Sequence, residues 1–87
     1  MTIAEVKKQL ESNKLVFGTE RSMQQLKLGK AQKIFLSKNC PDKIRNDIFH
    51  YASLSHTEVV VLEEENTEIG GICKKPFAIS VLTLLKQ

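Results

Sequence analysis

Long apolar runs, cysteines and clusters of reactive side chains are all scarce in this sequence of 87 residues, and each scarcity excludes a class of protein. The longest apolar stretches, Ile34–Leu36 and Val59–Leu62, are far shorter than the roughly 20 residues of a membrane-spanning helix. The polar N-terminus does not resemble a secretion signal. Cys40 and Cys73 stand alone, which fits free thiols in a reducing compartment better than a disulfide framework. We therefore expect a cytoplasmic protein with no membrane partner.

Catalytic and metal-binding patterns are equally sparse. His50 and His56 do not share one helical face, and no serine has the glycine context of a nucleophile elbow. No C-x-x-C or H-x-x-x-H pair anchors a metal site, and Gly70-Gly71 lacks the glycine pattern of a phosphate loop. The sequence predicts no enzyme, no metal and no cofactor.

What the sequence does have is an uneven distribution of charge. Residues 1–45 contain ten Lys or Arg and four Asp or Glu, whereas residues 46–87 contain three and six. A basic half is typical of a protein that meets an anionic partner with one face, although lysines on an ordinary solvated surface explain it equally well. Apolar residues make up 41% of the chain, enough for one small core, so we expect a single domain over residues 1–87.

Apolar periodicity predicts helices and strands that alternate along the whole chain. Consecutive Ile34, Phe35 and Leu36 imply a strand buried on both faces, and Gly29 marks a left-handed helix end. Short connections between alternating elements favour an α/β sheet covered by helices on both faces. The predicted helices cover 2–13, 19–28, 41–54 and 66–73. Thr2, Thr19 and Asn66 are expected to cap the first, second and fourth of these helices. The predicted strands cover 15–17, 31–37, 58–62 and 77–85.

Three connections in this arrangement, residues 17–21, 38–41 and 74–79, are expected to gather at one end of the sheet. Helix starts expose unpaired N–H groups to anions there. Lysines and helix ends suit phosphates, an asparagine reads base edges and an aromatic ring stacks on an unpaired base, so this surface favours RNA. The side chains that would share it are those of Lys30, Lys38, Asn39, Lys75 and Phe77.

The order of short motifs resembles the ribosomal protein L-thirty-e family, within the wider L-seven-Ae group of kink-turn RNA binders. The motifs are collinear and together cover nearly the whole chain. They are Phe17-Gly18-Thr19, Leu26-Lys27-Leu28-Gly29-Lys30-Ala31, Ser37-Lys38-Asn39-Cys40-Pro41, Tyr51-Ala52-Ser53-Leu54-Ser55, Glu68-Ile69-Gly70 and Lys75-Pro76-Phe77-Ala78-Ile79-Ser80.

The resemblance implies a three-layer α/β/α sandwich around a mixed four-stranded sheet, with no catalytic residue. It implies a component of the archaeal or eukaryotic-type large ribosomal subunit that is monomeric when free and meets RNA and other ribosomal components. Members of the group bind kink-turns, which are sharply bent RNA duplexes with sheared G·A pairs and a bulge.

By position, the resemblance also implies residue roles. Gly18, Thr19, Glu20 and Arg21 would form the turn that docks in the RNA groove, and Asn39 would approach a base or ribose. Phe77 and Ile79 would pack on the extruded nucleotide, and Lys27, Lys30 and Lys38 would lie near phosphates. Glu20 stands where the family usually has a basic residue, and Lys74 replaces a common glycine.

Each of these residues also has a purely structural explanation. In this explanation Gly18 allows a positive φ and Thr19 caps a helix. Asn39 satisfies a turn, and Phe77 fills the core at a strand start. Two other functions stay open, a kink-turn protein outside the ribosome and a protein–protein adaptor. The acidic run 63–65 is expected to lie away from the RNA surface because it would repel phosphates.

Overall fold

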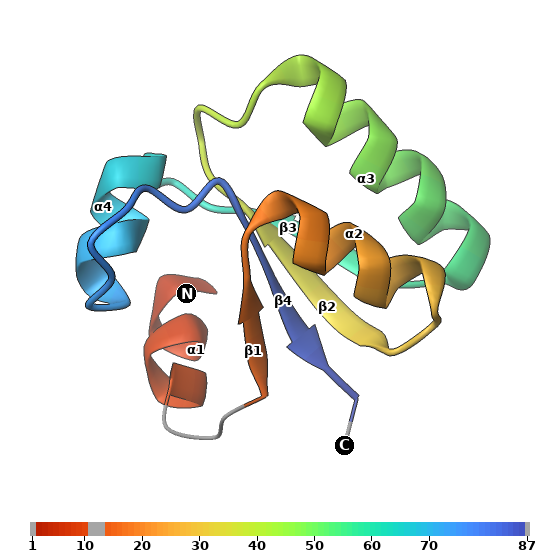
Figure 1. Cartoon of the computed structure of the whole chain (residues 1–87), viewed down its shortest axis with the longest axis horizontal. Helices are drawn as coiled ribbons and strands as arrows, with labels where there is room; N and C mark the ends of the chain where they lie inside the picture. The colour runs from red at the N-terminus through yellow and green to blue at the C-terminus, as the bar shows by residue number, and fades with distance from the viewer. Residues whose placement is uncertain (1, 11–13, 87) are drawn as a thin grey trace.

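The computed structural model describes residues 2–10 and 14–86, and helices and strands alternate along them as the sequence predicts (Figure 1). Residues 11–13, the expected end of the first helix, lie outside the described residues. The elements are α1 (Thr2–Gln9), β1 (Leu15–Phe17), α2 (Thr19–Lys27), β2 (Ala31–Leu36), α3 (Asp42–Ser55), β3 (Glu58–Val61), α4 (Asn66–Ile72) and β4 (Val81–Leu85).

The four strands form one mixed sheet in the order β1-β4-β2-β3. β2 is parallel to β3, and β4 is antiparallel to both β1 and β2. These directions place the ends of β1, β2 and β3 and the start of β4 at one edge of the sheet, which we call the loop edge. Ile34, Phe35 and Leu36 in β2 are fully buried, so the expectation of a central strand covered on both faces is confirmed.

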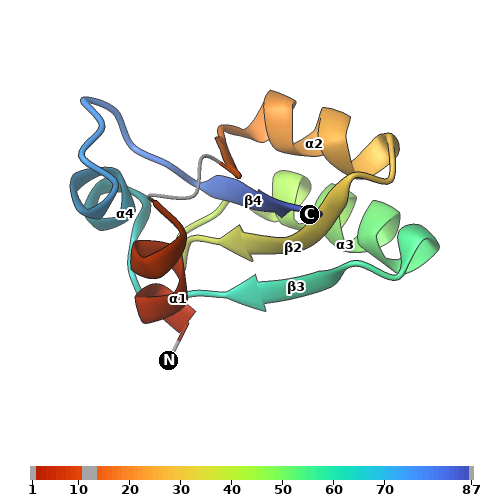
Figure 2. The ribbon, with the colours of Figure 1, turned by 90° about the horizontal axis from the view of Figure 1, so that it is seen from below.

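Helices cover both faces of this sheet and make three layers. Val6 of α1 and Ile69 of α4 pack with Phe35 in one core, whereas Leu26 of α2 and Ile48 of α3 pack in the other. Figure 2 shows α1 and α3 on opposite sides of the strands. Alternate side chains of a strand point to opposite faces, so the apolar run of β2 contributes side chains to both cores. The predicted α/β/α sandwich is confirmed.

The last strand is shorter than the sequence predicts. β4 begins at Val81 and not at Phe77, because β1 ends opposite Leu82 and β2 ends opposite Val81, so neither strand pairs with residues 77–80. Residues 77–80 form a loop instead, whose backbone bonds reach Asn66 and Ser37. The loop exposes part of a segment that the apolar pattern assigned to a strand.

The expected side-chain caps of two helices are wrong. Gly18 stands at the N-cap of α2 and Glu65 at that of α4, with no side-chain cap bond at either, so Thr19 and Asn66 are the first residues of their helices. Gly18 has φ 103°, a conformation that favours glycine, and this turn starts the helix one residue earlier than a Thr19 cap would. The left-handed Gly29 is confirmed, with φ 73°.

Candidate functional site

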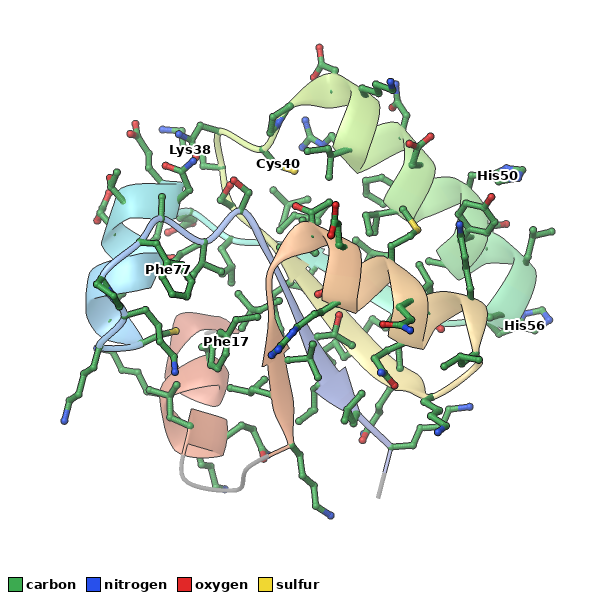
Figure 3. All side chains as sticks on the ribbon, viewed as in Figure 1. Phe17, Lys38, Cys40, His50, His56 and Phe77 are labelled. Atoms are coloured by element: carbon green, nitrogen blue, oxygen red, sulfur yellow. The ribbon has the colours of Figure 1, made fainter. Side chains whose placement is uncertain are left out.

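Backbone hydrogen bonds bring the three predicted connections together at the loop edge. The Gly18 N–H donates to the Val81 carbonyl at 3.0 Å, and the Ser37 N–H donates to the Ser80 carbonyl at 2.8 Å. Residues 80 and 81, where β4 begins, therefore hold the turn before α2 on one side and the turn before α3 on the other. The predicted convergence is confirmed, and Figure 3 shows Phe17, Lys38 and Phe77 on the elements that meet there.

A cluster of amide side chains fixes the middle of this edge. Asn39 accepts a bond from the Asn66 N–H at 2.8 Å, and its own Nδ2 donates to Asn66 Oδ1 at 3.1 Å. Asn66 Nδ2 in turn donates to Ser80 Oγ at 3.2 Å, and the Asn66 carbonyl accepts the Ile79 N–H at 3.0 Å. Asn39 thus satisfies the first N–H of α4, 27 residues away, and not a local turn as its structural explanation proposed. An amide nitrogen carries two hydrogens, so one stays available to a ligand at an exposed position.

The start of α2 lies beside this cluster. The first backbone bond of the helix runs from the Ser22 N–H to the Gly18 carbonyl, so the N–H groups of Thr19, Glu20 and Arg21 precede it. Aligned peptide dipoles give this end a partial positive charge, which favours an anion. The exposed side chains of Glu20 and Arg21 flank the same end with opposite charges.

The two residues expected to pack on a nucleotide lie in different surroundings. Phe77 is 53% exposed, so the view that it fills the core is wrong and its ring is open to a ligand. Ile79 is 1% exposed and packs in the core beneath α1 and α4. Its expected contact with a nucleotide does not fit this buried position, and we leave it out of the interface.

The expected phosphate-binding lysines are divided between the two ends of the sheet. Lys38 belongs to the loop edge, whereas Lys30 precedes β2 at the opposite edge, where its carbonyl accepts the Lys86 N–H. Lys27 lies at the end of α2, about 12 Å from Thr19 along a nine-residue helix, with its ammonium 5.0 Å from the centre of the Tyr51 ring. The structure does not bring Lys27 and Lys30 together with the loop edge.

A groove along α2 joins the two ends nevertheless. It has a volume of about 410 Å³ and is lined by residues at i, i+4 and i+8 on one helical face, Thr19, Met23 and Lys27, together with Glu20 and Gln24. Gln24 was not among the predicted site residues, although its i, i+4 spacing from Glu20 places it on the same face of the helix. Lys27 is therefore on the same face of α2 as the helix start.

The acidic run lies closer to this surface than expected. The Lys38 N–H donates to the Glu64 carbonyl at 2.8 Å, because β3 ends at the same edge of the sheet as β2. The expectation that residues 63–65 lie away from this surface is wrong. Negative charge occupies the β3 side of the loop edge, and the α2 and β1 side carries the exposed Arg21 and Lys75.

The two cysteines are free thiols, as expected. Burial raises the pKa of Cys40, an effect that Arg45 opposes and Asp42 reinforces, and burial also raises the pKa of Cys73 against the effect of Lys75. Both thiols are therefore neutral and poor nucleophiles near neutral pH.

Within residues 2–10 and 14–86, no group of three or more His, Cys, Asp or Glu could hold a metal ion. No helix in that part of the chain is long and apolar enough to cross a membrane.

Comparison with known proteins identifies similar chains. Residues 2–87 match the family described as ribosomal protein L7Ae/L30e/S12e/Gadd45. The large ribosomal subunit protein eL30 of Methanococcus maripaludis is 35% identical over 77 residues, covering 88% of this chain and 73% of that protein. The eL30 of Saccharolobus solfataricus is 30% identical over 83 residues, covering 95% and 77%. The fold is similar to that of a Giardia lamblia 15.5kD RNA binding protein, with a TM-score of 0.77 at 17% identity over 94% of this chain and 68% of that one.

Proposed function

The chain belongs to the ribosomal protein L7Ae/L30e/S12e/Gadd45 family, and from this membership we propose that it is an RNA-binding component of the large ribosomal subunit whose target is a kink-turn. The observation that carries the proposal is the convergence at the loop edge of an open helix start, a fixed asparagine and an exposed phenylalanine. Relatives named as large-subunit proteins support the ribosomal assignment. We propose a monomer that acts without catalysis in the cytoplasm.

Each part of the loop edge has a role in this proposal. The N–H groups at the start of α2 and the Arg21 guanidinium bind phosphates in one groove of the RNA. Asn39 donates its second amide hydrogen to a base or ribose, and Phe77 stacks on the extruded nucleotide. Glu20 accepts a hydrogen bond from a guanine N–H, a role that removes the cost of a carboxylate among phosphates.

The groove along α2 explains how one small protein would hold two arms of a bent duplex. The helix start contacts the first arm, and Lys27, on the same face about 12 Å further along, approaches a phosphate of the second. Because both contacts form together only when the arms are sharply bent, binding selects the kinked conformer from those that the free RNA samples. The acidic run directs the RNA toward α2 and β1 and away from β3.

A titration of two RNAs tests the proposal. The protein should bind a kink-turn more tightly than a control in which Watson–Crick pairs replace the sheared G·A pairs, and equal affinities would refute kink-turn recognition. Phe77→Ala should weaken kink-turn binding by about 1–3 kcal/mol, the range for a base stacked on an aromatic ring, with little loss of stability because the ring is exposed.

Phe49→Ala is the matched control, since Phe49 is a phenylalanine of similar exposure, 43%, on α3. It should leave affinity unchanged. Equal losses for the two variants would remove Phe77 from the interface, and a large drop in the melting temperature of Phe77→Ala would return it to the core. Sedimentation of the protein with large ribosomal subunits separates the ribosomal assignment from binding to a free kink-turn.

A further inference from the structure

A second cationic feature lies beside the loop edge and shares Lys75 with it. It is a cleft of about 520 Å³ between α1, β1 and the segment that follows α4. Its volume falls within the range of ordinary ligand-binding pockets. The residues that line it are Lys7, Leu10, Leu15, Phe17, Cys73, Lys74 and Lys75, and we call it the lysine cleft.

The lining of the lysine cleft combines positive charge with an apolar floor. The side chains of Lys7, Lys74 and Lys75 are exposed, and no acidic residue is among the lining residues that the structure describes. Leu10 and Leu15 form the apolar part. The Lys75 ammonium lies 4.9 Å from the centre of the Phe17 ring, which is half-buried against the core, so the cation covers one face of that ring.

Lys74 adds a backbone observation at the same place. It has φ 59°, one of two non-glycine residues with positive φ among those described. It follows the C-cap of α4, where its N–H donates to the Gly71 carbonyl and the Lys75 N–H donates to the Gly70 carbonyl, so the left-handed conformation belongs to the helix end. This helix end places the Lys74 ammonium in the lining of the cleft.

We propose that the lysine cleft is a second RNA subsite, which takes an unpaired nucleotide of the strand next to the kink-turn. The inference rests on the proposed function. Phosphates suit the three ammonium groups, and a base suits the apolar floor beside the Lys75–Phe17 pair. The cleft is continuous with the proposed interface, because Phe17 directly precedes Gly18 and Lys75 lies two residues, at most about 7 Å between Cα atoms, before Phe77.

The acidic run also favours this path for the strand. Residues 63–65 follow β3, at the far side of the sheet from β1, so a strand that leaves the kink-turn is repelled there and attracted toward the lysine cleft. An acidic peptide would satisfy the lysines but would leave the apolar floor without a planar partner. The combination therefore favours a nucleotide.

Binding of a minimal kink-turn RNA is compared with binding of the same RNA carrying a short single-stranded extension at the 5′ or the 3′ end. For the wild-type protein, one of the two extensions should tighten binding about fivefold or more, the effect of a single stacked base. Lys7→Ala should abolish that gain and lower the salt dependence of the extended RNA by about 0.7, the slope for one single-strand phosphate. It should leave the minimal RNA unaffected, since α1 is outside the loop edge.

Two variants keep the experiment decisive. Lys8→Ala removes an exposed lysine of the same helix that does not line the cleft, so it should retain the gain. Lys74→Gly should lose the gain while folding normally, because glycine fits the left-handed backbone without strain.

Several outcomes would overturn the inference. The first is that neither extension tightens binding, and the second is that Lys7→Ala and Lys8→Ala lose the gain in affinity equally. The third is that an acidic peptide of equal charge displaces the extension, which would make the lysine cleft a protein-binding site. Failure of the proposed function has another signature, equal wild-type affinity for the minimal kink-turn and its fully paired control. That result would also end the inference, which depends on it.

Discussion

Two adjacent glycines in α4 provide a direct test of how the Phe77 loop is held. Both lie inside the helix, which continues to Ile72. Gly70 is buried, and a methyl group at its α-carbon would overlap the carbonyl oxygen of Phe77 and lie 3.1 Å from the Phe77 carbonyl carbon. Gly71 is exposed, with nothing within 4 Å of such a methyl group. The pair separates helix propensity from close packing.

The magnitudes follow from two opposing effects. Either Gly→Ala change stabilises the helix by about 1 kcal/mol, because alanine loses less backbone entropy on folding. At Gly70 the new methyl group meets backbone, which cannot rotate away as a side chain does, so the overpacking cost is near the upper end of about 1–3 kcal/mol. The free energy of unfolding should fall by about 2 kcal/mol in Gly70→Ala and rise by about 1 kcal/mol in Gly71→Ala.

Thermal denaturation followed by circular dichroism measures both changes. A domain of this size shifts its melting temperature by about 4–8 °C per kcal/mol, so the two variants should differ by more than about 12 °C. Because Gly70→Ala displaces the backbone of Phe77, it should also weaken kink-turn binding, whereas Gly71→Ala should not. Equal melting temperatures for the two variants would show that the 77–80 loop does not pack on α4 as described.

The other predictions concern the amide cluster and the thiols. Asn66→Ala should lower the free energy of unfolding by about 1–2 kcal/mol and weaken kink-turn binding, because it removes two side-chain bonds that hold Asn39 and Ser80. Urea titration measures the first effect and RNA titration the second. Unchanged RNA affinity would show that Asn39 needs no support from Asn66. The raised pKa values of Cys40 and Cys73 mean that the folded protein holds these protons more tightly, so their contribution to stability is complete below the ordinary thiol pKa of about 8.5 and is lost as the pH rises through the folded values. Urea denaturation across this range should show a decline that the double Cys→Ala variant reduces, and identical profiles would contradict the burial of the thiols.

Elements whose cause is local were predictable from the sequence. The strand at 15–17 and the buried run Ile34–Leu36 depend on residue type and spacing alone, and their positions in the structure agree. The start of β4 was not predictable in this way, because it depends on where β1 and β2 end in space. An apolar pattern predicts only that a side chain is buried. Ile79 is buried although it lies in a loop and not in a strand.

The candidate site follows the same division. Its convergence at one edge could be inferred, since strand directions follow from alternating helices and strands. The role of Asn66 could not be inferred, because its partner Asn39 lies 27 residues away in the sequence. A polar residue at the start of a short helix also has the same sequence pattern as an ordinary cap. The position of residues 63–65 also depended on topology, because only the parallel pairing of β2 with β3 brings them to the loop edge.

The amide cluster bears on how tightly a protein of this size can bind RNA. Ordering a loop on binding costs free energy for each side chain immobilised, and that cost subtracts from affinity. Here Asn39 is already held by two hydrogen bonds, and the loop that carries Phe77 is held by the bond from the Ile79 N–H to the Asn66 carbonyl. Much of the ordering is therefore completed during folding, and the contacts of Asn39 and Phe77 can contribute more fully to recognition. A flexible loop edge with the same side chains would bind the same RNA more weakly.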